Sequence, residues 1–492
     1  MKNLKDKVKK EFESQIDVDL HFDTSNLEPN SKPSVRKNVI IRRTILATLS
    51  VGAICLVSIP IIKSMESKET FKQFKKQYTQ SELKQIELDS FKKLNEINYP
   101  ESNEKRKVSD EYHDSVIEFS NRIYSSMNKE NISFSPLNLH MNLSVLSLAS
   151  DNEITLQALD NLLGMNKISR EQDFINAYIN DYFYNNNGTI QMYNGYFATN
   201  KYESNTDFIS SLTRHYTEAY QVDFNSDQSV NKILKWVDQK VQDKNFLNKK
   251  NLDIKEDTAF LLMSTLYFKN SWRNTFNAQD TSDDVFYLEN GSKINVSYLF
   301  HSYYGDCYDY EDYISCYDYY ENGLKIKYLI PKTDVSNSVF ELIQNVNIFK
   351  DDETRRIKSE TGHSWNDNPI VKLKVPKFES ECMIDFSPIL KDNGLEYLFD
   401  EMGKSFNYAF DNLPIDHSIC LDYVKQKNQI SFDEDGTTIK SISFAMGGDK
   451  ATATAPMTAD TIEVNLNRPF IYIIYDSNDL PIFVGNVNNP KK

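Results

Sequence analysis

DEDGTT at residues 433–438 is the stretch that decides the fold, because it begins an ordered series of motifs near the C-terminus. A segment without proline follows from residue 437 to residue 455 and includes most of ATATAP at 451–456. NRPF at 467–470 and FVGNVNNP at 483–490 come next. The series predicts an acidic turn, a long exposed loop and an apolar strand before a closing Gly-x-Val motif.

Four motifs upstream match one known family in the same order. They are NISFSPLN at 131–138, AFLLMSTLYFKNSW at 259–272, VPKF at 375–378 and NGL at 393–395. Each motif is weak alone, but with the C-terminal series they make five in the right order between residues 131 and 490. The chain therefore resembles the serpins. Two departures from the family pattern are Asn138 in place of a serine and Ser264-Thr265 in place of Asn-Ala.

The resemblance implies an α+β fold of the serpin type, in which a large central mixed β-sheet is flanked by helices and carries an exposed reactive loop. It implies a protease inhibitor and not an enzyme. In the family mechanism, a serine protease or a papain-like cysteine protease attacks the loop and forms an acyl-enzyme, and the cut loop then enters the sheet as a new strand. The alternatives are a serpin-fold binding or scaffold protein and a simple protease substrate.

The hinge of the loop follows the acidic turn in this comparison. An inserting segment must alternate its side chains between the two faces of the sheet and must lack proline. With Thr437 inward, the residues on its side are small or apolar, whereas Lys440 points outward. Ile439 and Ile442 are bulky where inhibitory serpins usually carry alanines, which favours the non-inhibitory alternative. The resemblance assigns the hinge to Glu434, Gly436, Thr437, Ile439, Ser441 and Ser443.

The reactive bond is placed by the family's usual loop length. Counted from Glu434, that length puts the bond between Lys450 and Ala451. A lysine before the bond suits a trypsin-like protease with an acidic specificity pocket. The alternatives are that Lys450 is only a solvated loop charge, and that the bond lies at Ala453, Thr454 or Met457.

Four polar residues from distant segments match the cluster under the family's central sheet, at the point where the sheet opens. They are Ser135, Asn138, Ser264 and Gln426. A buried polar group without a partner costs about 1–3 kcal/mol, so a substituted cluster should still satisfy its own hydrogen bonds. The alternative is four polar residues in unrelated places. Trp272 matches the tryptophan of the breach, the end of the sheet at which the loop enters.

Composition limits the classes of partner. The chain has 492 residues and a formal net charge of -15, which argues against nucleic acid because phosphate binding needs a basic surface. Its histidines form no metal-ligand cluster and pair with no nucleophile, so we expect no cofactor, no metal and no catalytic site. The expected partner is a protease, and the expected state is a monomer. The Tyr, Phe, Asn, Lys and Ile content fits an AT-rich genome, and we expect a bacterial source.

Cysteine positions leave the redox state open. Cys307 and Cys316 are close enough in sequence to pair in an oxidising compartment. Cys382 and Cys420 can pair only if the fold brings them together. Unrelated free thiols are the alternative.

TILATLSVGAICLVSIPII at 44–62 carries no charge. At about 1.5 Å per residue it spans roughly 28 Å, near the thickness of a bilayer's hydrocarbon core. Basic residues precede it, so the positive-inside rule puts the N-terminus in the cytoplasm and the rest of the chain outside a cell membrane, anchored by one transmembrane helix. The alternatives are an atypical signal peptide and a buried core helix.

The chain divides into four segments. We expect a cytoplasmic tail at 1–43, a transmembrane helix at 44–62, a helical or polar stalk at 63–104 and a serpin domain at 105–492. Apolar residues from Phe71 to Leu94 stand at rough helical intervals in the stalk, and an extended linker is the alternative. Within the domain the patterns predict helices at 112–124, 154–163 and 231–241, and strands at 259–268, 324–330, 371–375, 429–432, 461–466 and 470–475. Helices come early and strands late, which favours α+β.

Overall fold

The fold is that of a computed structural model, which describes residues 90–99, 106–127, 131–183, 190–244, 246–332, 339–360, 367–439 and 460–491. The predicted tail, the predicted membrane helix and residues 63–89 and 100–104 of the predicted stalk lie outside the described residues. No helix in the described part is both long enough and apolar enough to cross a membrane. The span at 44–62 therefore stays a prediction.

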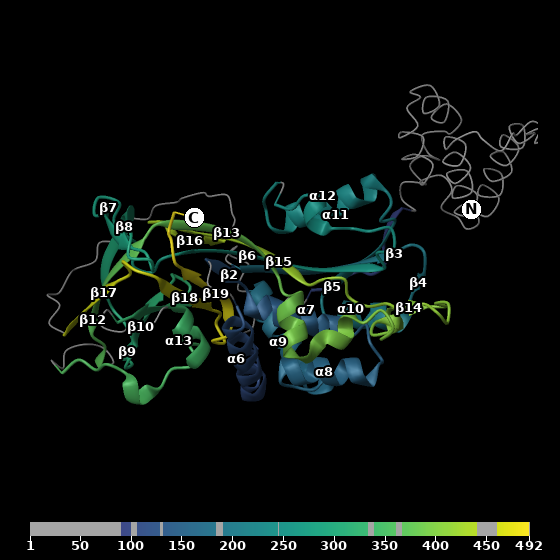
Figure 1. The fold of residues 1–492 in the computed structure, drawn as a ribbon, viewed down its shortest axis with the longest axis horizontal. Coiled ribbons are helices and arrows are strands. Elements are labelled where there is room, and N and C mark those ends of the chain that lie inside the picture. The colour runs from purple at the N-terminus through teal and green to yellow at the C-terminus, as the bar shows by residue number, and fades with distance from the viewer. Residues whose placement is uncertain are drawn as a thin grey trace, which may run out of the picture.

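A seven-stranded mixed sheet forms the centre of the molecule (Figure 1). Strands β3 and β5 pair in parallel, and the other neighbours pair antiparallel. In spatial order the strands are β1 (Phe91–Lys93), β5 (Thr217–Val222), β3 (Ile190–Thr199), β6 (Phe260–Ser271), β16 (Gly436–Ile439), β15 (Lys425–Phe432) and β13 (Phe378–Asp385). The large mixed sheet that the resemblance implied is present.

Both faces of this sheet are covered. Because successive side chains of a strand point to opposite faces, neighbouring residues of β3 enter different cores. The Tyr196 ring packs edge-on against Phe208 on one face, with centroids 5.1 Å apart. The Phe197 ring meets Trp236 of helix α11 (Asp227–Lys240) on the other face, at 5.5 Å. Helix α11 and the short α12 (Lys249–Leu252) therefore cover one face of the sheet, as Figure 1 shows.

The other helices lie on the opposite face or beside it. They are α6 (Asp110–Ser125), α7 (Pro136–Ser147), α8 (Glu153–Leu163), α9 (Lys167–Phe183), α10 (Thr206–Arg214), α13 (Val339–Asn345) and α14 (Ser387–Leu390). The start of α7 follows from its sequence. Ser135 caps the helix by accepting a hydrogen bond from the Asn138 amide, and Pro136 occupies the first turn, where its missing N–H costs nothing. This fixes Asn138 in the first turn, directly under the sheet.

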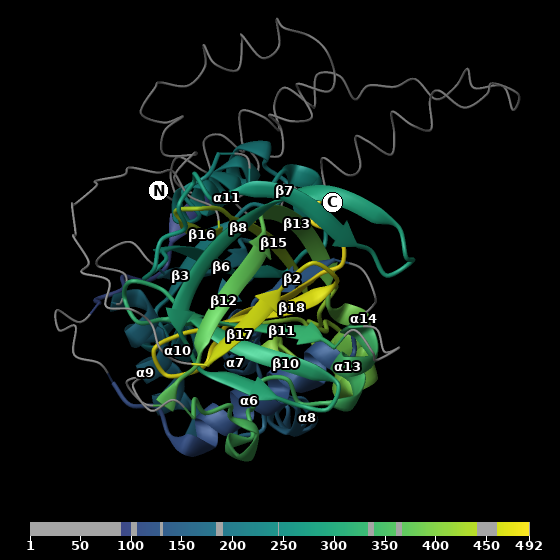
Figure 2. The same ribbon diagram turned by 90° about the vertical axis from the view of Figure 1, so that its left-hand side faces the viewer.

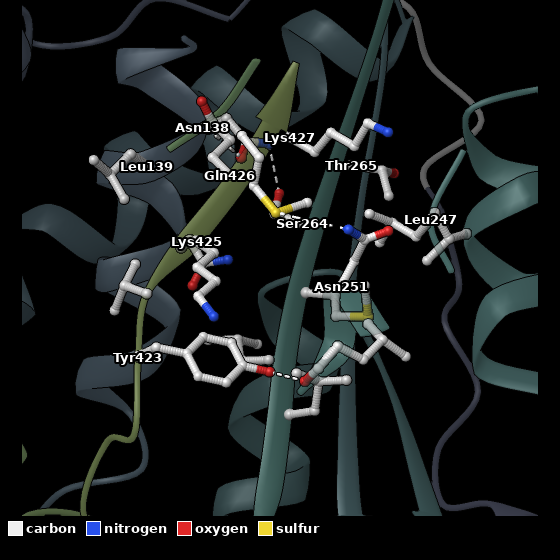
Figure 3. A pocket seen from close by; sticks show the side chains of 18 of the residues that line it. Asn138, Leu139, Leu247, Asn251, Ser264, Thr265, Tyr423, Lys425, Gln426 and Lys427 are labelled. Carbon is white, nitrogen blue, oxygen red and sulfur yellow. Dashed lines mark hydrogen bonds between the residues drawn. The ribbon is translucent and has the colours of Figure 1, made fainter. Parts of the chain in front are cut away.

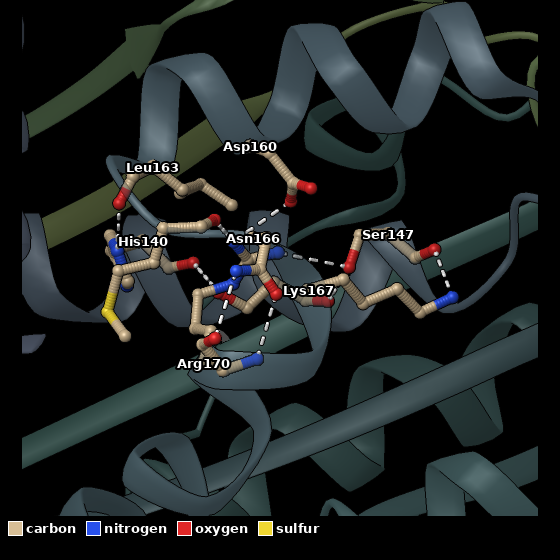
Figure 4. A network of polar contacts seen from close by, with 10 residues as sticks. His140, Ser147, Asp160, Leu163, Asn166, Lys167 and Arg170 are labelled. Carbon is tan, nitrogen blue, oxygen red and sulfur yellow. Dashed lines mark hydrogen bonds and ion pairs between the residues drawn. The ribbon is translucent and has the colours of Figure 1, made fainter.

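A buried arginine joins helices α7, α8 and α9 (Figure 4). Arg170 donates through Nη1 to the Met165 carbonyl and to Asp160 Oδ1 at 3.1 Å, and through Nη2 to Ser147 Oγ at 3.4 Å. Lys167 Nζ donates to the Ser147 carbonyl at 3.1 Å. A buried cation needs such partners, because an unpaired buried charge is costly. The network therefore holds the three helices in place beneath the sheet.

Two smaller sheets make up one end of the molecule, onto which Figure 2 looks. The six-stranded sheet consists of β2 (Ile132–Phe134), β19 (Pro481–Val487), β18 (Phe470–Tyr475), β11 (Lys325–Pro331), β10 (Tyr313–Tyr319) and β9 (Cys307–Asp309). The four-stranded sheet consists of β17 (Thr461–Asn465), β12 (Ile370–Pro376), β8 (Lys293–Tyr304) and β7 (Ser282–Tyr287). A pair of two-residue strands, β4 (Glu203–Ser204) and β14 (Phe410–Asp411), completes the set. The C-terminal motifs NRPF and FVGNVNNP thus lead into or contain two central strands, β18 and β19.

Residues 90–99 belong to the folded domain. Phe91, expected on a helical face of the stalk, lies in β1 and packs its ring 5.1 Å from the ring of Tyr220. The Leu94 amide donates to the Ala219 carbonyl at 2.7 Å, and Asn95 Oδ1 accepts from the Ala219 amide at 2.8 Å. The prediction of a helix across Phe91 and Leu94 is wrong, because Phe91 lies in an edge strand on β5, Leu94 directly follows that strand, and both side chains are half-buried.

The predicted elements of the domain can be compared one by one. Helices α6, α8 and α11 confirm the predictions at 112–124, 154–163 and 231–241, and strands β6, β11, β12, β17 and β18 confirm five strand predictions. The strand predicted at 429–432 is longer, since β15 begins at Lys425 and pairs with β13 along its length. Strands β2 and β3 lie among the early helices, so the expected order of helices before strands holds only in part.

Candidate functional site

The segment that follows the acidic turn enters the central sheet. Strand β16 lies between β6 and β15, with Gly436 opposite Ser271 and Ile439 opposite Phe268. On its other side Thr437 is opposite Phe432 of β15. Gly436 is required by this approach, because a Cβ at that position would overlap the carbonyl oxygen of Asn270.

Thr437 is fully buried at this point. Its Oγ1 accepts a hydrogen bond of 2.8 Å from the hydroxyl of Tyr320. The Tyr320 ring is stacked on Trp272, with centroids 4.9 Å apart, and Trp272 Nε1 donates to the Asp433 carbonyl at 3.0 Å. The Trp272–Tyr320 stack thus contacts the segment on both sides of Gly436, through Asp433 and Thr437. We call Trp272 and Tyr320 the aromatic platform.

Glu434 is held by an ion pair. Its Oε2 lies 2.7 Å from Lys377 Nζ, and its Oε1 accepts from the Thr281 hydroxyl at 2.9 Å. Partial burial acts to raise the pKa of Glu434, but the hydrogen bond from Lys377 and the other donors outweigh it and leave the pKa below its ordinary value. The carboxylate therefore stays ionised at neutral pH and ties the acidic turn to the residue that precedes β13.

Below β16 the sheet is split. Strands β6 and β15 each pair with β16, and in the described part they do not pair with each other. A cavity of about 180 Å³ lies along the split (Figure 3). Its walls come from 260–266 of β6, 425–428 of β15 and the start of α7, and the end of α11 with residues 246–252 covers it. Strand β16 fills one end of the split, and the cavity lies along the rest of it.

The four polar residues predicted to cluster meet at this split, and Figure 3 shows Asn138, Ser264 and Gln426 among them. Asn138 Nδ2 donates to Ser264 Oγ of β6 at 2.6 Å, and Asn138 Oδ1 accepts from Gln426 Nε2 of β15 at 3.2 Å. Gln426 Oε1 accepts from the Ser135 amide at 2.8 Å, and Gln426 Nε2 also donates to the Ser135 carbonyl at 3.2 Å. Asn138 therefore bridges the two separated strands through side-chain hydrogen bonds.

Of the remaining predicted residues, one is described in the structure and four are not. Ile439 ends β16, whereas Ser441, Ser443, Lys450 and Ala451 lie outside the described residues. Two residues of the site were missed as site residues. Lys377 stands in the VPKF motif, but nothing in the sequence indicates that its partner is Glu434. Tyr320 gave no signal, because its role depends on a contact with a residue 117 positions away.

Cys307 and Cys316 form a disulfide. The two residues are directly opposite each other in β9 and β10, with Cα atoms 4.2 Å apart. Cys382 and Cys420 carry free thiols. Burial raises the pKa of both thiols, so both stay protonated and weakly nucleophilic at neutral pH.

Comparison with known proteins gives one consistent family. The family model described as "Serpin (serine protease inhibitor)" matches residues 111–490. An uncharacterized serpin-like protein of Acanthamoeba polyphaga mimivirus is 25% identical over 399 residues, which cover 77% of this chain and 90% of that protein. Alpha-1-antitrypsin 1-5 of Mus musculus is 22% identical over 387 residues, which cover 77% and 87%.

Solved structures agree on the fold. The native state of the thermophilic serpin tengpin has a TM-score of 0.64 and 21% identity, and the match covers 81% of this chain and 100% of that one. The latent state of tengpin has a TM-score of 0.63 and 22% identity, with 78% and 99% covered. These relatives do not indicate a source organism, so the bacterial origin stays a prediction.

Proposed function

The chain belongs to the serpin family, and we propose that it inhibits a serine or papain-like cysteine protease by inserting its cleaved loop into the split of the seven-stranded sheet. The protease cuts the loop between residues 440 and 459, the acyl-enzyme forms, and the freed loop extends β16 down the split. The attached protease is then carried along the sheet and its active site is distorted.

One observation supports this proposal above the others. Strand β16 already lies between β6 and β15, so the beginning of the loop has the position and the direction that insertion needs. The split continues below Ile439, where the edges of both strands face a cavity and not each other. A strand that adds residues 440–448 would bring backbone donors and acceptors to both edges.

The side chains of the loop, which alternate between the two faces of the sheet, also support insertion. Thr437 is buried on the Tyr320 side of the sheet. Alternation then turns Ile439, Ser441 and Ser443 to that side and Lys440 to the other. The inward positions carry no charge, which a buried strand requires.

A second candidate function has its own support. Ile439 is large and β-branched, and a slow insertion would let the acyl-enzyme hydrolyse before the protease is trapped. The chain would then be a serpin-fold binding protein or a substrate. The two candidates differ in whether a covalent complex accumulates.

The site of cleavage and the location follow as parts of the proposal. Lys450 before the cut bond favours a trypsin-like target. The apolar segment 44–62 anchors the chain in the cell membrane with the serpin domain outside. The Cys307–Cys316 disulfide supports an oxidising exterior for that domain.

The test is incubation of residues 90–492 with a trypsin-like protease, followed by denaturing electrophoresis and mass spectrometry. Trapping predicts an SDS-resistant band at the summed mass and a released peptide that begins at Ala451. Complete cleavage with an active protease and no such band would favour the second candidate. A Lys450→Ala variant is the control, because it should lose the complex with a trypsin-like enzyme and keep its fold.

A further inference from the structure

An open groove lies beside strands β4 and β14, at the end of the central sheet remote from β16 (Figure 1). Its volume is about 430 Å³. Its apolar and aromatic lining comes from Tyr408, Phe410, Leu413, Pro414 and Ile415. Ile415 is 92% exposed, so a large aliphatic side chain stands at the groove and contacts little of the domain.

Exposed large hydrophobic side chains concentrate around this groove. In the described residues seven such side chains are exposed, and three of them belong to this region, namely Ile154, Met402 and Ile415. Asn152 Nδ2 donates to the Gly403 carbonyl at 3.1 Å, which joins the first two of these regions. Their neighbours Asp151 and Lys404 both line the groove. A cluster of exposed apolar side chains marks a surface that another segment or molecule covers.

The groove also has an acidic side. Asp151 and Asp411 line it, and Glu203 lies opposite Asp411 in the β4–β14 pair. Lys404 is the one basic side chain among the lining residues, and its Nζ donates to the Ile415 carbonyl at 2.8 Å. A surface with this balance of charge attracts an occupant that combines apolar with basic side chains.

The described chain begins close to the groove. Strand β1 pairs with β5, so Lys92 lies opposite Gln221. Gln221 Nε2 donates to the Tyr202 carbonyl at 3.2 Å, and the Tyr202 ring packs edge-on against Phe410 with centroids 5.7 Å apart. Phe410 lines the groove. Only the contacts of Gln221 and Tyr202 therefore separate strand β1 from the groove.

The part of the chain that precedes β1 has the matching chemistry. FKQFKKQY at 71–78 contains three lysines and no acidic residue. Its aromatic residues recur at intervals typical of one helical face, and they are Phe71, Phe74 and Tyr78. The residues between 78 and 90 can span up to about 40 Å when extended, which is enough to reach the groove. We call residues 71–78 the basic aromatic segment.

We propose that the groove binds the basic aromatic segment of the same chain, with the aromatic side chains on the apolar lining and the lysines toward Asp151 and Asp411. A separate partner must overcome the entropy of association. A segment on a short tether is present at a high effective concentration instead, so a modest contact area suffices to hold it. The chain itself is therefore the occupant that this position favours.

Docking fixes the orientation of the domain relative to the stalk. Residues 268–271 of β6 pair with β16, whereas Phe260 at the other end of β6 pairs with Ala198, close to β4. The strand from residue 260 to residue 268 is roughly 26 Å long. The hinge is therefore held away from the docked segment, and the loop that follows it stays open to a protease.

The test is photo-cross-linking of the full chain, residues 1–492, in detergent micelles at low protein concentration. Phe74 is replaced by a photoreactive phenylalanine analogue, and mass spectrometry identifies the peptides that the cross-link joins. The proposal predicts a cross-link within one chain to residues 404–415. Cross-links to detergent alone, to a second copy of the chain or to another part of the domain would each overturn it.

Two variants and a matched control test the chemistry of the contact. Ile415→Gln should lower the yield of the cross-link about fivefold or more, because the isoleucine no longer gains burial on docking. Lys75→Glu combined with Lys76→Glu should lower it also, through repulsion from the acidic side chains. Ile168→Gln changes a similarly exposed isoleucine beyond the other end of α8 and should keep the yield. Equal yields in Ile415→Gln and Ile168→Gln would contradict the docking, and because no protease takes part, a failure of trapping leaves this result unaffected.

Discussion

Asn138 Nδ2 donates to Ser264 Oγ across 2.6 Å, and this hydrogen bond attaches helix α7 to strand β6 at the edge of the split. The same Asn138 side chain accepts from Gln426 of β15. One residue thus holds both strands that must separate further for a loop to enter. The cluster links the two edges of the split below β16 through polar contacts that can be exchanged.

Asn138→Ala should destabilise the intact protein by about 1–3 kcal/mol for each partner left without a hydrogen bond. Ser264 and Gln426 both lose a partner, and their polar atoms remain beneath the sheet. Urea unfolding followed by circular dichroism measures the loss. Asn142→Ala is the matched control, one turn along α7 in the lining of the same cavity. An equal loss in both variants would mean that the bridge contributes nothing specific.

Thr437→Arg should abolish trapping and leave cleavage intact. The guanidinium charge would have to enter the buried site beside Tyr320, where the hydroxyl of the native Thr437 is fully buried. Thr438→Arg is the control, because alternation turns residue 438 to the other face. Electrophoresis of each variant after incubation with the protease gives the result. Complex formation by Thr437→Arg, or its loss in Thr438→Arg, would show that the assigned facing is wrong.

Strand β1 should stabilise the edge of the central sheet. A chain that begins at residue 90 keeps the Phe91 ring on Tyr220 and the Asn95 hydrogen bonds, whereas a chain that begins at residue 100 loses them. We expect the shorter chain to melt lower, because it loses the packing of the half-buried Phe91 ring on Tyr220 and the hydrogen bonds of Asn95. Differential scanning calorimetry compares the two. Identical melting would assign residues 90–99 to the stalk after all.

Stability should fall as pH rises through the titration of a buried carboxyl pair. Burial is the main cause that raises the pKa of Asp181 well above its usual range and that of Asp476 to about 6. A carboxyl with a raised pKa in the folded state binds its proton more tightly there than in the unfolded chain, where the value is about 3.9. Its contribution is therefore present at low pH and is lost between about pH 4 and pH 7.

Asp181→Asn replaces one carboxyl group of the pair with an amide, which does not titrate. The variant should lose less stability than the wild type as the pH rises above about 4, where the carboxyl groups of the unfolded chain ionise. Urea midpoints at a series of pH values measure this difference. Asp479→Asn, at an exposed carboxylate three residues after Asp476, is the control that should nearly follow the wild type, because the charge of Asp479 is the smallest of the causes that shift the pKa of Asp476.

The parts of the site that could be predicted from the sequence are those that lie in or near short motifs. The acidic turn and Gly436 mark the start of β16, and Ser135, Asn138, Ser264 and Gln426 could be located because each stands in or near a recognisable motif. Once Thr437 is taken as inward, the period of a strand fixes the facing of the residues that follow it. These features depend on residue order within short segments.

Other features depend on contacts between distant segments, which one sequence does not reveal. Phe91 has helical spacing with its neighbours, but β5 offers an edge and turns the segment into a strand. Tyr320 and Thr437 are 117 positions apart, and Lys377 and Glu434 are 57 positions apart. Nothing near either residue in the chain indicates its partner.

The melting temperature of the protein before and after cleavage of its loop is the most direct measure of the central claim. Residues 90–492 are cut within the loop, and both forms are heated under identical conditions. The account predicts that the cut form melts well above the intact one, because the loop completes the split sheet as a further strand between β6 and β15. Equal melting temperatures, with the cleavage shown to be complete, would contradict it.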